Sequence, residues 1–379
     1  MCCWRRNVAE YKTLVKKIPI APEKKTKQKD YQKRGQLPIV DQGQSLIGGY
    51  TDDVSMSVQC DLPVIVFGDH TRAVKYITFP FGAGADGIKV LKPNENILPL
   101  FLYYGTQYIV AKMPDRGYAR HYQYVEKEEL AVPPLQEQER IVSRIEELFS
   151  QLDDGVETLK KTKAQLAVYR QAVLKEAFAE LTEKKPIREM SSLVTSGSRG
   201  WAQYYADNGA RFIRITDLTR DGIHLKNDSI QYVALPNKAE GKRSRLLGSD
   251  VLVSITADLG SIALIPQNID EAYINQHIAM IRFTNPSQGE FMAWYLRSEW
   301  GQKDLLKNRR GGGKLGLGLD DIRDTPVPVV SDKTARQTIA FIDDRLSICE
   351  SIEQTVDTAL QQAEAMQQSI LKEAFEGRI

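Results

Sequence analysis

Two long stretches of the chain carry apolar residues at a spacing of seven. Residues 135–181 contain no proline, and Gly155 is their only glycine. The heptad positions of the first stretch are Ile145, Leu152, Leu159, Leu166 and Val173. Those of the second stretch are Ile342, Cys349, Val356, Ala363 and Ile370. A heptad pattern sustained over four repeats predicts two long helices in a coiled coil, the first about 45 residues and about 70 Å long.

Companion apolar positions complete the predicted contact between these helices: Leu148, Tyr169, Ile352, Ala359 and Met366. Gly155 marks a candidate kink or break, because a glycine inside a helix costs about 1 kcal/mol relative to alanine. Two matched helices in one chain most simply pair with each other in antiparallel orientation. The alternative is that each helix packs on its own neighbouring domain.

The helices belong to an internal repeat. Residues 170–178 and 367–375 both end in Leu-Lys-Glu-Ala-Phe, and the offset between them is 197 residues. Proline-rich segments at 132–134 and 326–328 precede the two helices. A repeated proline-led start, long helix and ending indicate a duplication with a pseudo-twofold axis.

The segments outside the helices differ from them in amino-acid composition. Residues 1–131 and 186–326 hold most of the prolines, glycines and tyrosines, and short β-rich runs such as 63–67 and 251–255 recur in them. Turn residues separate these runs. The predicted fold is therefore mixed α+β. A first globular domain (1–131) is followed by a central helix (132–185), a second globular domain (186–326) and a C-terminal helix (327–379).

Charge is sorted by segment. The whole chain has 51 Lys and Arg against 49 Asp and Glu, a net charge of +2. By segment the net charge is +5 in 1–131, −1 in 132–185, +2 in 186–326 and −4 in 327–379. The total excludes a generic polycation, but the two basic globular domains are consistent with a nucleic-acid partner.

Basic residues gather in loops beside glycine or aromatic residues. Residues 309–314 read Arg-Arg-Gly-Gly-Gly-Lys, where glycines allow close approach to a phosphate. Arg forms bidentate bonds to guanine, and Asn or Gln to adenine. The DNA-contact candidates are His70, Arg72, Lys75, Arg116, Tyr118, Arg120, Arg199, Trp201, Lys242, Arg243, Arg245, Asn275, Gln276, Arg309, Arg310 and Lys314.

Catalytic and cofactor motifs are not recognisable in the chain. Residues 82–87 fit G-x-G-x-x-G, but the following segment reads as a strand that ends at proline, whereas a dinucleotide site needs a helix there. The four histidines and four cysteines lack the spacing of metal ligands or of a disulfide framework. We therefore expect no catalytic residue, no metal and no cofactor on this chain.

Membrane and secretion signals are also not apparent. No apolar run approaches the ~18 residues of a membrane span. Residues 1–6 are not followed by the apolar stretch of a secretory signal. We therefore expect a cytoplasmic protein.

The chain resembles the specificity subunit of type I restriction-modification systems over essentially its full length. The most telling segment is 132–142, together with the repeated Leu-Lys-Glu-Ala-Phe, whose second copy continues as Glu-Gly-Arg-Ile. Further similar segments lie inside the globular domains, at 67–72, 84–87, 196–201, 274–277 and 315–317. Two segments depart from the family pattern: 329–333 lacks the usual Pro-Leu-x-Glu-Gln run, and 1–11 matches a domain start imperfectly.

The resemblance implies two target-recognition domains that each read one half of a bipartite, asymmetric DNA site. The helices would set the unread spacer. Two modification subunits would bring S-adenosylmethionine and adenine methylation, and restriction subunits would bring ATP and Mg²⁺ chemistry. The alternatives are a stand-alone DNA methyltransferase or nuclease, and a coiled-coil scaffold that binds no DNA.

Overall fold

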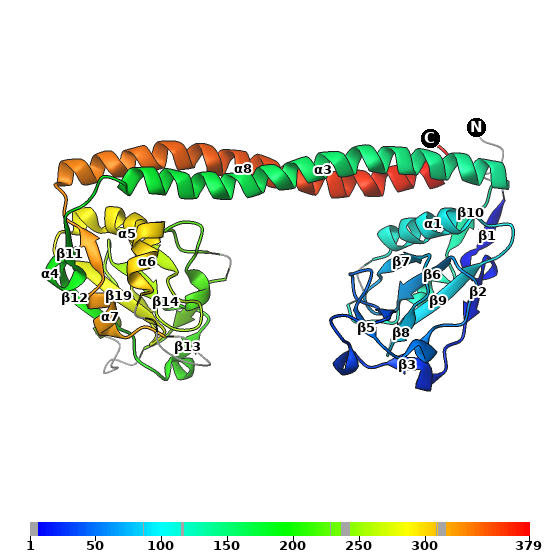
Figure 1. Ribbon diagram of the computed structural model, residues 1–379, viewed down its shortest axis with the longest axis horizontal. Coiled ribbons are helices and arrows are strands. Elements are labelled where there is room, and N and C mark those ends of the chain that lie inside the picture. Colours follow the sequence, from blue (N-terminus) through cyan, green and yellow to red (C-terminus); the bar gives the residue numbers. More distant parts are fainter. Residues whose placement is uncertain are drawn as a thin grey trace. The chain divides into compact units, whose positions relative to one another are not determined.

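The computed structural model describes residues 7–85, 87–114, 117–227, 229–235, 243–307, 309 and 316–379. Contacts divide the chain into two compact units (Figure 1). Unit 1 comprises residues 1–159 and 357–379, and unit 2 comprises residues 160–356. Each unit contains one globular domain and part of each long helix.

The first domain, in unit 1, contains two four-stranded sheets. One has the order β2–β9–β6–β7 and is antiparallel; the other has the order β3–β8–β4–β5, with β8 parallel to β3 and β4. The strands are β2 (Val15–Ile18), β3 (Lys25–Thr26), β4 (Leu37–Val40), β5 (Gly49–Thr51), β6 (Val64–Gly68), β7 (Val74–Ile77), β8 (Gly82–Gly84) and β9 (Ile88–Pro93).

Strand β6 shows why these layers form. Alternate side chains of a strand point to opposite faces. Ile65 and Phe67 pack in the core cluster that includes residues of α1 (Pro99–Lys112), whereas Val64 and Val66 pack in the cluster of Val40 and Ala83. Apolar residues on both faces therefore place β6 between α1 and the second sheet.

The second domain, in unit 2, repeats the first sheet as β12–β19–β16–β17. Its other sheet, β13–β15–β14–β18, keeps the parallel pair β14–β18 but has the short strand β13 beside β15, whereas β3 of the first domain lies beside β8. On β16, Val251 and Val253 share a core with α5, while Leu252 shares one with Ile213 and Ile274. The strands are β12 (Ser191–Ser196), β13 (Tyr205–Ala206), β14 (Ala210–Ile213), β15 (Gln231–Val233), β16 (Val251–Ser254), β17 (Ile262–Leu264), β18 (Ala272–Ile274) and β19 (Ile278–Phe283). The helices are α4 (Ile187–Met190), α5 (Gly289–Arg297), α6 (Glu299–Leu305) and α7 (Leu319–Arg323).

The two domains share one strand register. Gly68 faces Ile88 across β6 and β9, and Ser254 faces Ile278 across β16 and β19. The next backbone bond is also repeated: the Asp69 amide donates to the Gly87 carbonyl, and the Ile255 amide to the His277 carbonyl. The internal duplication predicted from the helices therefore extends through the domains, where no repeated motif revealed it.

A short two-stranded ladder precedes each long helix. β1 (Val8–Glu10) pairs with β10 (Glu129–Ala131), and β11 (Lys184–Pro186) pairs with β20 (Pro326–Pro328). The helices that follow are α3 (Leu135–Phe178) and α8 (Asp332–Phe375), each of 44 residues. The predicted break at Gly155 was wrong, since α3 continues through this position. One unfavourable residue does not interrupt a helix stabilised by packing along its length.

Within each unit the long helices run antiparallel. In unit 1, Arg140 near the start of α3 donates through Nη2 to the carbonyl of Ile379, just beyond the end of α8 (3.0 Å). In unit 2, Arg170 and Glu353 form an ion pair of 2.7 Å. The antiparallel coiled coil and the mixed α+β class predicted from the sequence are confirmed.

Burial follows the predicted heptads and shows one misreading. The buried heptad residues are Ile145, Val173, Ile342, Cys349, Val356 and Ala363. The half-buried ones are Leu152, Leu159, Leu166 and Ile370. Three companion residues expected in the contact are instead exposed, namely Tyr169 (46%), Ile352 (40%) and Met366 (56%). The packed face of each helix is narrower than the apolar pattern indicated.

The ends of both long helices also pack into the cores of the globular domains. At these ends a helix therefore packs on a domain, as the alternative prediction had it. The repeated phenylalanine is the clearest case. Phe178 lies 5.5 Å from the rings of Phe291 and Tyr295 in the second domain. Phe375 lies 5.0 Å from Phe101 and 5.4 Å from Tyr108 in the first domain. Each long helix therefore follows one domain in the chain and ends in the core of the other.

Candidate nucleic-acid interface

Four loops of the first domain meet at the ends of β4, β6, β8 and α1. The Thr71 hydroxyl donates to the carbonyl of Gln42, which joins the loops after β6 and β4. The Asp69 amide donates to the Gly87 carbonyl, which joins the loops after β6 and β8. The His121 amide donates to the Asp69 carbonyl (2.8 Å), which adds the loop after α1. We call residues 41–44, 69–72, 85, 87 and 117–121 loop surface 1.

An exposed aromatic side chain stands on this surface. The rings of His70 and Tyr118 stack with 4.4 Å between centroids and 5° between planes. His70 is held in turn by a hydrogen bond between its Nδ1 and the carbonyl of Ala119 (3.1 Å). Tyr118 is 84% exposed, and Arg120 beside it is also exposed. A supported aromatic ring next to a cation suits contact with sugar, phosphate or an accessible base.

A cleft of about 890 Å³ adjoins loop surface 1. Its lining includes Gln42 and Tyr118 together with three lysines, at positions 25, 27 and 29. Within the described part of the chain, none of the three lysines forms an ion pair. These lysines were not among the predicted contact residues, although their regular spacing in the basic N-terminal segment was a usable signal.

Lys75 occupies the interior beside this cleft. Its Nζ donates to the Asp41 carbonyl (2.7 Å) and lies 3.5 Å from Asp41 Oδ1. Burial lowers the pKa of this ammonium, and Asp41 partly offsets the effect. Burial and Asp41 together raise the pKa of Tyr31 to about 12. The ammonium of Lys75 is thus held by Asp41, and direct contact with DNA stays a prediction that its burial does not favour. Arg72 is half-buried in a left-handed conformation (φ 60°) in the turn after β6.

The second domain brings together the corresponding loops. The Thr256 hydroxyl and His277 Nδ1 are 2.7 Å apart, which joins the loops after β16 and β18. Arg220 Nε donates to Asp258 (2.8 Å), which adds the loop after β14, and this bond lowers the pKa of Asp258. The Leu317 amide donates to the Ile255 carbonyl (3.0 Å), which adds the loop after α6. We call residues 214–220, 255–258, 275–277, 309, 316 and 317 loop surface 2.

The loops that follow α1 and α6 make equivalent backbone bonds in their two domains, through His121 and Leu317. The bonds from His121 to Asp69 and from Leu317 to Ile255 are equivalent, because Asp69 and Ile255 both directly follow the equivalent strands β6 and β16. Arg309 is exposed, and its amide donates to the Leu306 carbonyl (3.3 Å). The remaining candidates, Arg116, Lys242, Arg310 and Lys314, lie outside the described residues.

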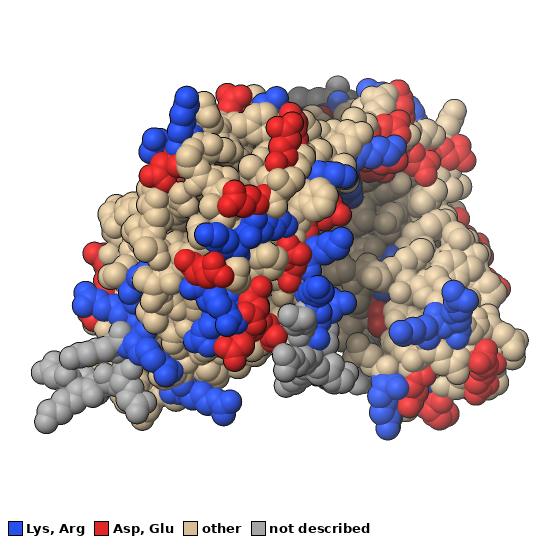
Figure 2. All heavy atoms as spheres, turned by 60° about the vertical axis from the view of Figure 1, so that its left-hand side comes forward, with Lys and Arg blue, Asp and Glu red and all other residues tan. Residues whose placement is uncertain are grey.

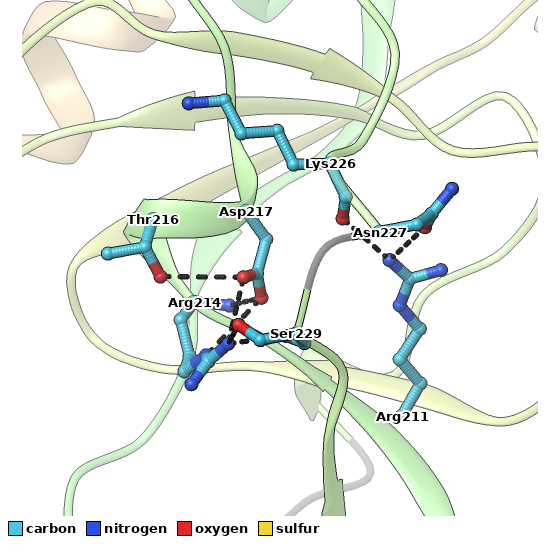
Figure 3. Close-up of polar contacts among 7 residues, drawn as sticks. All are labelled: Arg211, Arg214, Thr216, Asp217, Lys226, Asn227 and Ser229. Atoms are coloured by element: carbon cyan, nitrogen blue, oxygen red, sulfur yellow. Dashed lines mark hydrogen bonds and ion pairs between the residues drawn. The ribbon is translucent and has the colours of Figure 1, made fainter. Parts of the chain in front are cut away.

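Arg214 is the most firmly held cation of loop surface 2 (Figure 3). Its Nη2 donates to the Ser229 carbonyl (2.6 Å) and to Asp217 Oδ1 (3.1 Å). Asp217 is buried, and its other oxygen accepts from the Arg214 amide (2.8 Å). Nearby, Arg211 donates to Asn227 Oδ1 (2.8 Å). Arg214 was not among the residues predicted from the sequence, although Asp217 lies only three residues further along the chain.

The other candidates of the second domain divide by burial. Asn275 and Gln276 are half-buried on loop surface 2, and both contact His277. The exposed candidates are Arg199, Arg243 and Arg245. Trp201 is buried, with its ring 4.9 Å from Phe212 and 5.4 Å from Tyr273. Its contact with DNA stays a prediction, but the ring serves the core.

Charge on the surface is mixed. On the face drawn in Figure 2, Lys and Arg are interspersed with Asp and Glu. Among the described residues, no cluster of His, Cys, Asp and Glu is placed to hold a metal ion. The helices of the described residues include none with the length and apolar composition needed to cross a membrane. Strand β9 occupies the segment after residue 87, as predicted, whereas residues 82–84 of the glycine-rich segment form strand β8 and not a turn.

The architecture defines a class of protein in which two α+β domains of similar topology are joined by an antiparallel pair of long helices. Residues 15–167 match the family described as type I restriction modification DNA specificity domain. The chain is also similar to the EcoBI and EcoKI specificity subunits of Escherichia coli, with 23% identity over 283 residues and 24% over 272 residues. Each match covers 66% of this chain, and they span 58% and 57% of the two relatives.

A solved chain shares the fold along its whole length. It comes from a structure of a type I restriction-modification system, described as addressing complex assembly and conformational transition. The TM-score is 0.67 at 16% identity, with 98% of each chain covered. Together the comparisons confirm the resemblance to type I specificity subunits that the sequence motifs indicated.

Proposed function

We propose that this chain is the sequence-specific DNA-binding subunit of a type I restriction-modification complex. Each domain reads one half of a bipartite, asymmetric site, and the paired helices set the unread spacer. The observation that carries the proposal is the presence of two loop surfaces on one repeated scaffold with different side chains. Equivalent scaffolds fit equivalent tasks, and different side chains on them fit two different half-sites.

The chain itself is proposed to be non-catalytic. Modification subunits supply S-adenosylmethionine and methylate adenine, while restriction subunits supply ATP-driven and Mg²⁺-dependent chemistry. Affinity arises from phosphate contacts that release counterions, and linking two modest sites in one molecule raises the effective concentration of the second. The acidic helices suit a protein partner better than DNA.

Methylome sequencing tests this proposal. The chain is co-expressed with its modification subunits in a host free of adenine methylation. We expect a methylated bipartite motif with two unlike halves, which disappears when either component is omitted. Methyl transfer by the purified chain alone would instead support a stand-alone methyltransferase. If the complex with its partner shows no salt-sensitive DNA binding, the scaffold alternative is favoured.

A further inference from the structure

The shared register assigns equivalent positions to residues that no sequence pattern relates. Gly87 and His277 are equivalent because their carbonyls accept equivalent backbone bonds. Gly87 lies five residues after Gly82 of β8, and His277 lies five residues after Ala272 of β18. Gly82 pairs with Ile39 of β4 in the first domain, and Ala272 pairs with Arg211 of β14 in the second. Three residues further along the chain, Gln42 therefore corresponds to Arg214.

Arg214 is fixed in one orientation by groups that leave Nη1 of its guanidinium available. Nη2 is bound by Asp217 and by the Ser229 carbonyl, and Nε lies 3.5 Å from Asp217 Oδ2. Among the described residues, Nη1 has no hydrogen-bond partner, and the side chain is 29% exposed. A guanidinium that is oriented in advance loses little rotamer freedom on binding, and here it presents the two N–H donors of Nη1 in a fixed direction.

Gln42, at the position equivalent to Arg214, also has a side-chain atom without a hydrogen-bond partner among the described residues. It lines the cleft beside the three lysines and Tyr118. Its Oε1 is shielded from solvent and has no hydrogen-bond partner among the described residues. A Cβ at Gly87 would clash with this oxygen, so the glycine keeps room for the amide. A shielded acceptor without a donor is unfavourable until a donor is supplied.

We propose that Gln42 and Arg214 are the equivalent base-reading residues of the two domains, with Arg214 reading a guanine and Gln42 an adenine. This inference rests on the proposed function. The Nη1 donors of Arg214 suit the O6 and N7 acceptors of guanine, and the carboxamide of Gln42 suits the N6 donor and N7 acceptor of adenine in the major groove. Asp217 acts as a positioning residue for Arg214.

The test is methylome sequencing of matched variants in the assembled modification complex. Arg214→Lys keeps the charge and loses the guanidinium, and Gln42→Leu keeps the approximate size and loses the amide. We expect each variant to relax one base position in one half-site, by about 5- to 150-fold in discrimination. The two variants should affect different half-sites. Arg211→Lys, on the neighbouring arginine of Figure 3, is the control and should leave both half-sites unchanged.

Thermal unfolding of each variant separates reading from folding. A purely structural role for Arg214 predicts a lower melting temperature with an unchanged motif, and that result would overturn the inference for this residue. Gln42→Leu tests the other domain independently if Arg214→Lys does not fold. Unchanged motifs in both variants, or changes in both half-sites at once, would also overturn it. If the wild-type complex yields no bipartite motif, the proposed function fails instead.

Discussion

Lys75 and Asp41 form a charged pair in the interior of the first domain. The lysine side chain is 4% exposed and the aspartate 19% exposed. We predict that Lys75→Met destabilises the protein by about 3 kcal/mol, because removal of one partner leaves a poorly solvated carboxylate. Urea unfolding measures the change in stability, and Lys16→Met, at an exposed lysine of β2, is the control. If Lys75 contacted DNA, the variant would instead keep its stability and lower the salt dependence of binding.

Glu290 in α5 shows the opposite electrostatic situation. Burial, followed by the charge of Asp343, raises the pKa of its carboxyl above the ordinary 4.5, and His224 partly offsets this. The ionised form therefore costs stability above the folded-state pKa, and the cost vanishes as pH falls to 4.5. We predict that Glu290→Gln stabilises the protein at pH 8 and that the gain shrinks on acidification. Thermal melts between pH 8 and 4.5 check this.

Exposed Glu180→Gln is the matched control for that experiment. It should change stability little, with little dependence on pH. A Glu290→Gln variant that loses stability at pH 8 would show that the carboxylate makes a favourable contact there. The sign of the pH dependence, not its size, decides between the two outcomes.

At the residue scale, the sequence indicated which residue types are candidates for contact, but not how deeply each side chain is buried. Tyr118 and Trp201 are both aromatics beside glycine and arginine, yet one is 84% exposed and the other 5%. Lys75 and Arg120 are both cations in candidate segments, and only Arg120 reaches solvent. Depth depends on strand alternation and on long-range partners such as Asp41, which local spacing does not encode. The shielding of the Gln42 oxygen could not be predicted for the same reason.

The helices carry the clearest prediction at the element scale. Phe178 and Phe375 occupy the same place in the repeat but pack in different domains. We predict that Phe178→Ala loosens the second domain and Phe375→Ala the first, each by about 3–5 kcal/mol, because each change leaves a cavity among aromatic rings. Hydrogen exchange of β16 and β6 measures the two domains separately.

Each phenylalanine variant is the control for the other. An equal decrease of protection in both domains from a single variant would contradict the independent docking of the two helix ends. Replacement of an exposed residue next to one of them, such as Glu176→Ala, should leave both domains protected.

The elements themselves were largely predictable. Heptad spacing indicated both helices and their pairing, because a long periodic pattern is a strong signal. The exposed companions Tyr169, Ile352 and Met366 were misread, because an apolar residue near the packed face looks the same in sequence whether it meets a helix or solvent. The sheets were predicted only as β-rich runs, since their order depends on pairings between distant segments.

For the whole molecule, the first prediction concerns charge. We predict that Lys27→Gln with Lys29→Gln weakens non-specific binding to a duplex of arbitrary sequence. The slope of log K against log salt should become shallower by about 0.9 for each phosphate that the variant no longer neutralises. Lys16→Gln with Lys127→Gln removes the same charge from exposed positions outside the cleft lining and is the control. Equal effects of the two pairs would mean that only net charge matters.

The second prediction at this scale concerns binding to a protein partner. In unit 2, Val168 and Ile352 of the long helices are 70% and 40% exposed. We predict that Val168→Gln with Ile352→Gln weakens co-purification with the modification subunit, because exposed apolar side chains contribute most when a partner buries them. The melting temperature should change little. Gln165→Ala with Gln171→Ala is the control, and intact co-purification of the apolar variant would move the docking surface elsewhere.

Each long helix ends in the core of the domain that it does not follow. This packing also sets the order in which the two domains complete their cores during synthesis on the ribosome. The first domain is synthesised before the second, yet its core includes Leu371, Ala374 and Phe375 of α8, which are synthesised after the second domain. At about 5–20 residues per second, translation of the intervening segment takes roughly 12–50 s. During that interval the aromatic residues of α1 await their partner. The domain that emerges first is therefore completed only after the end of α8 has emerged.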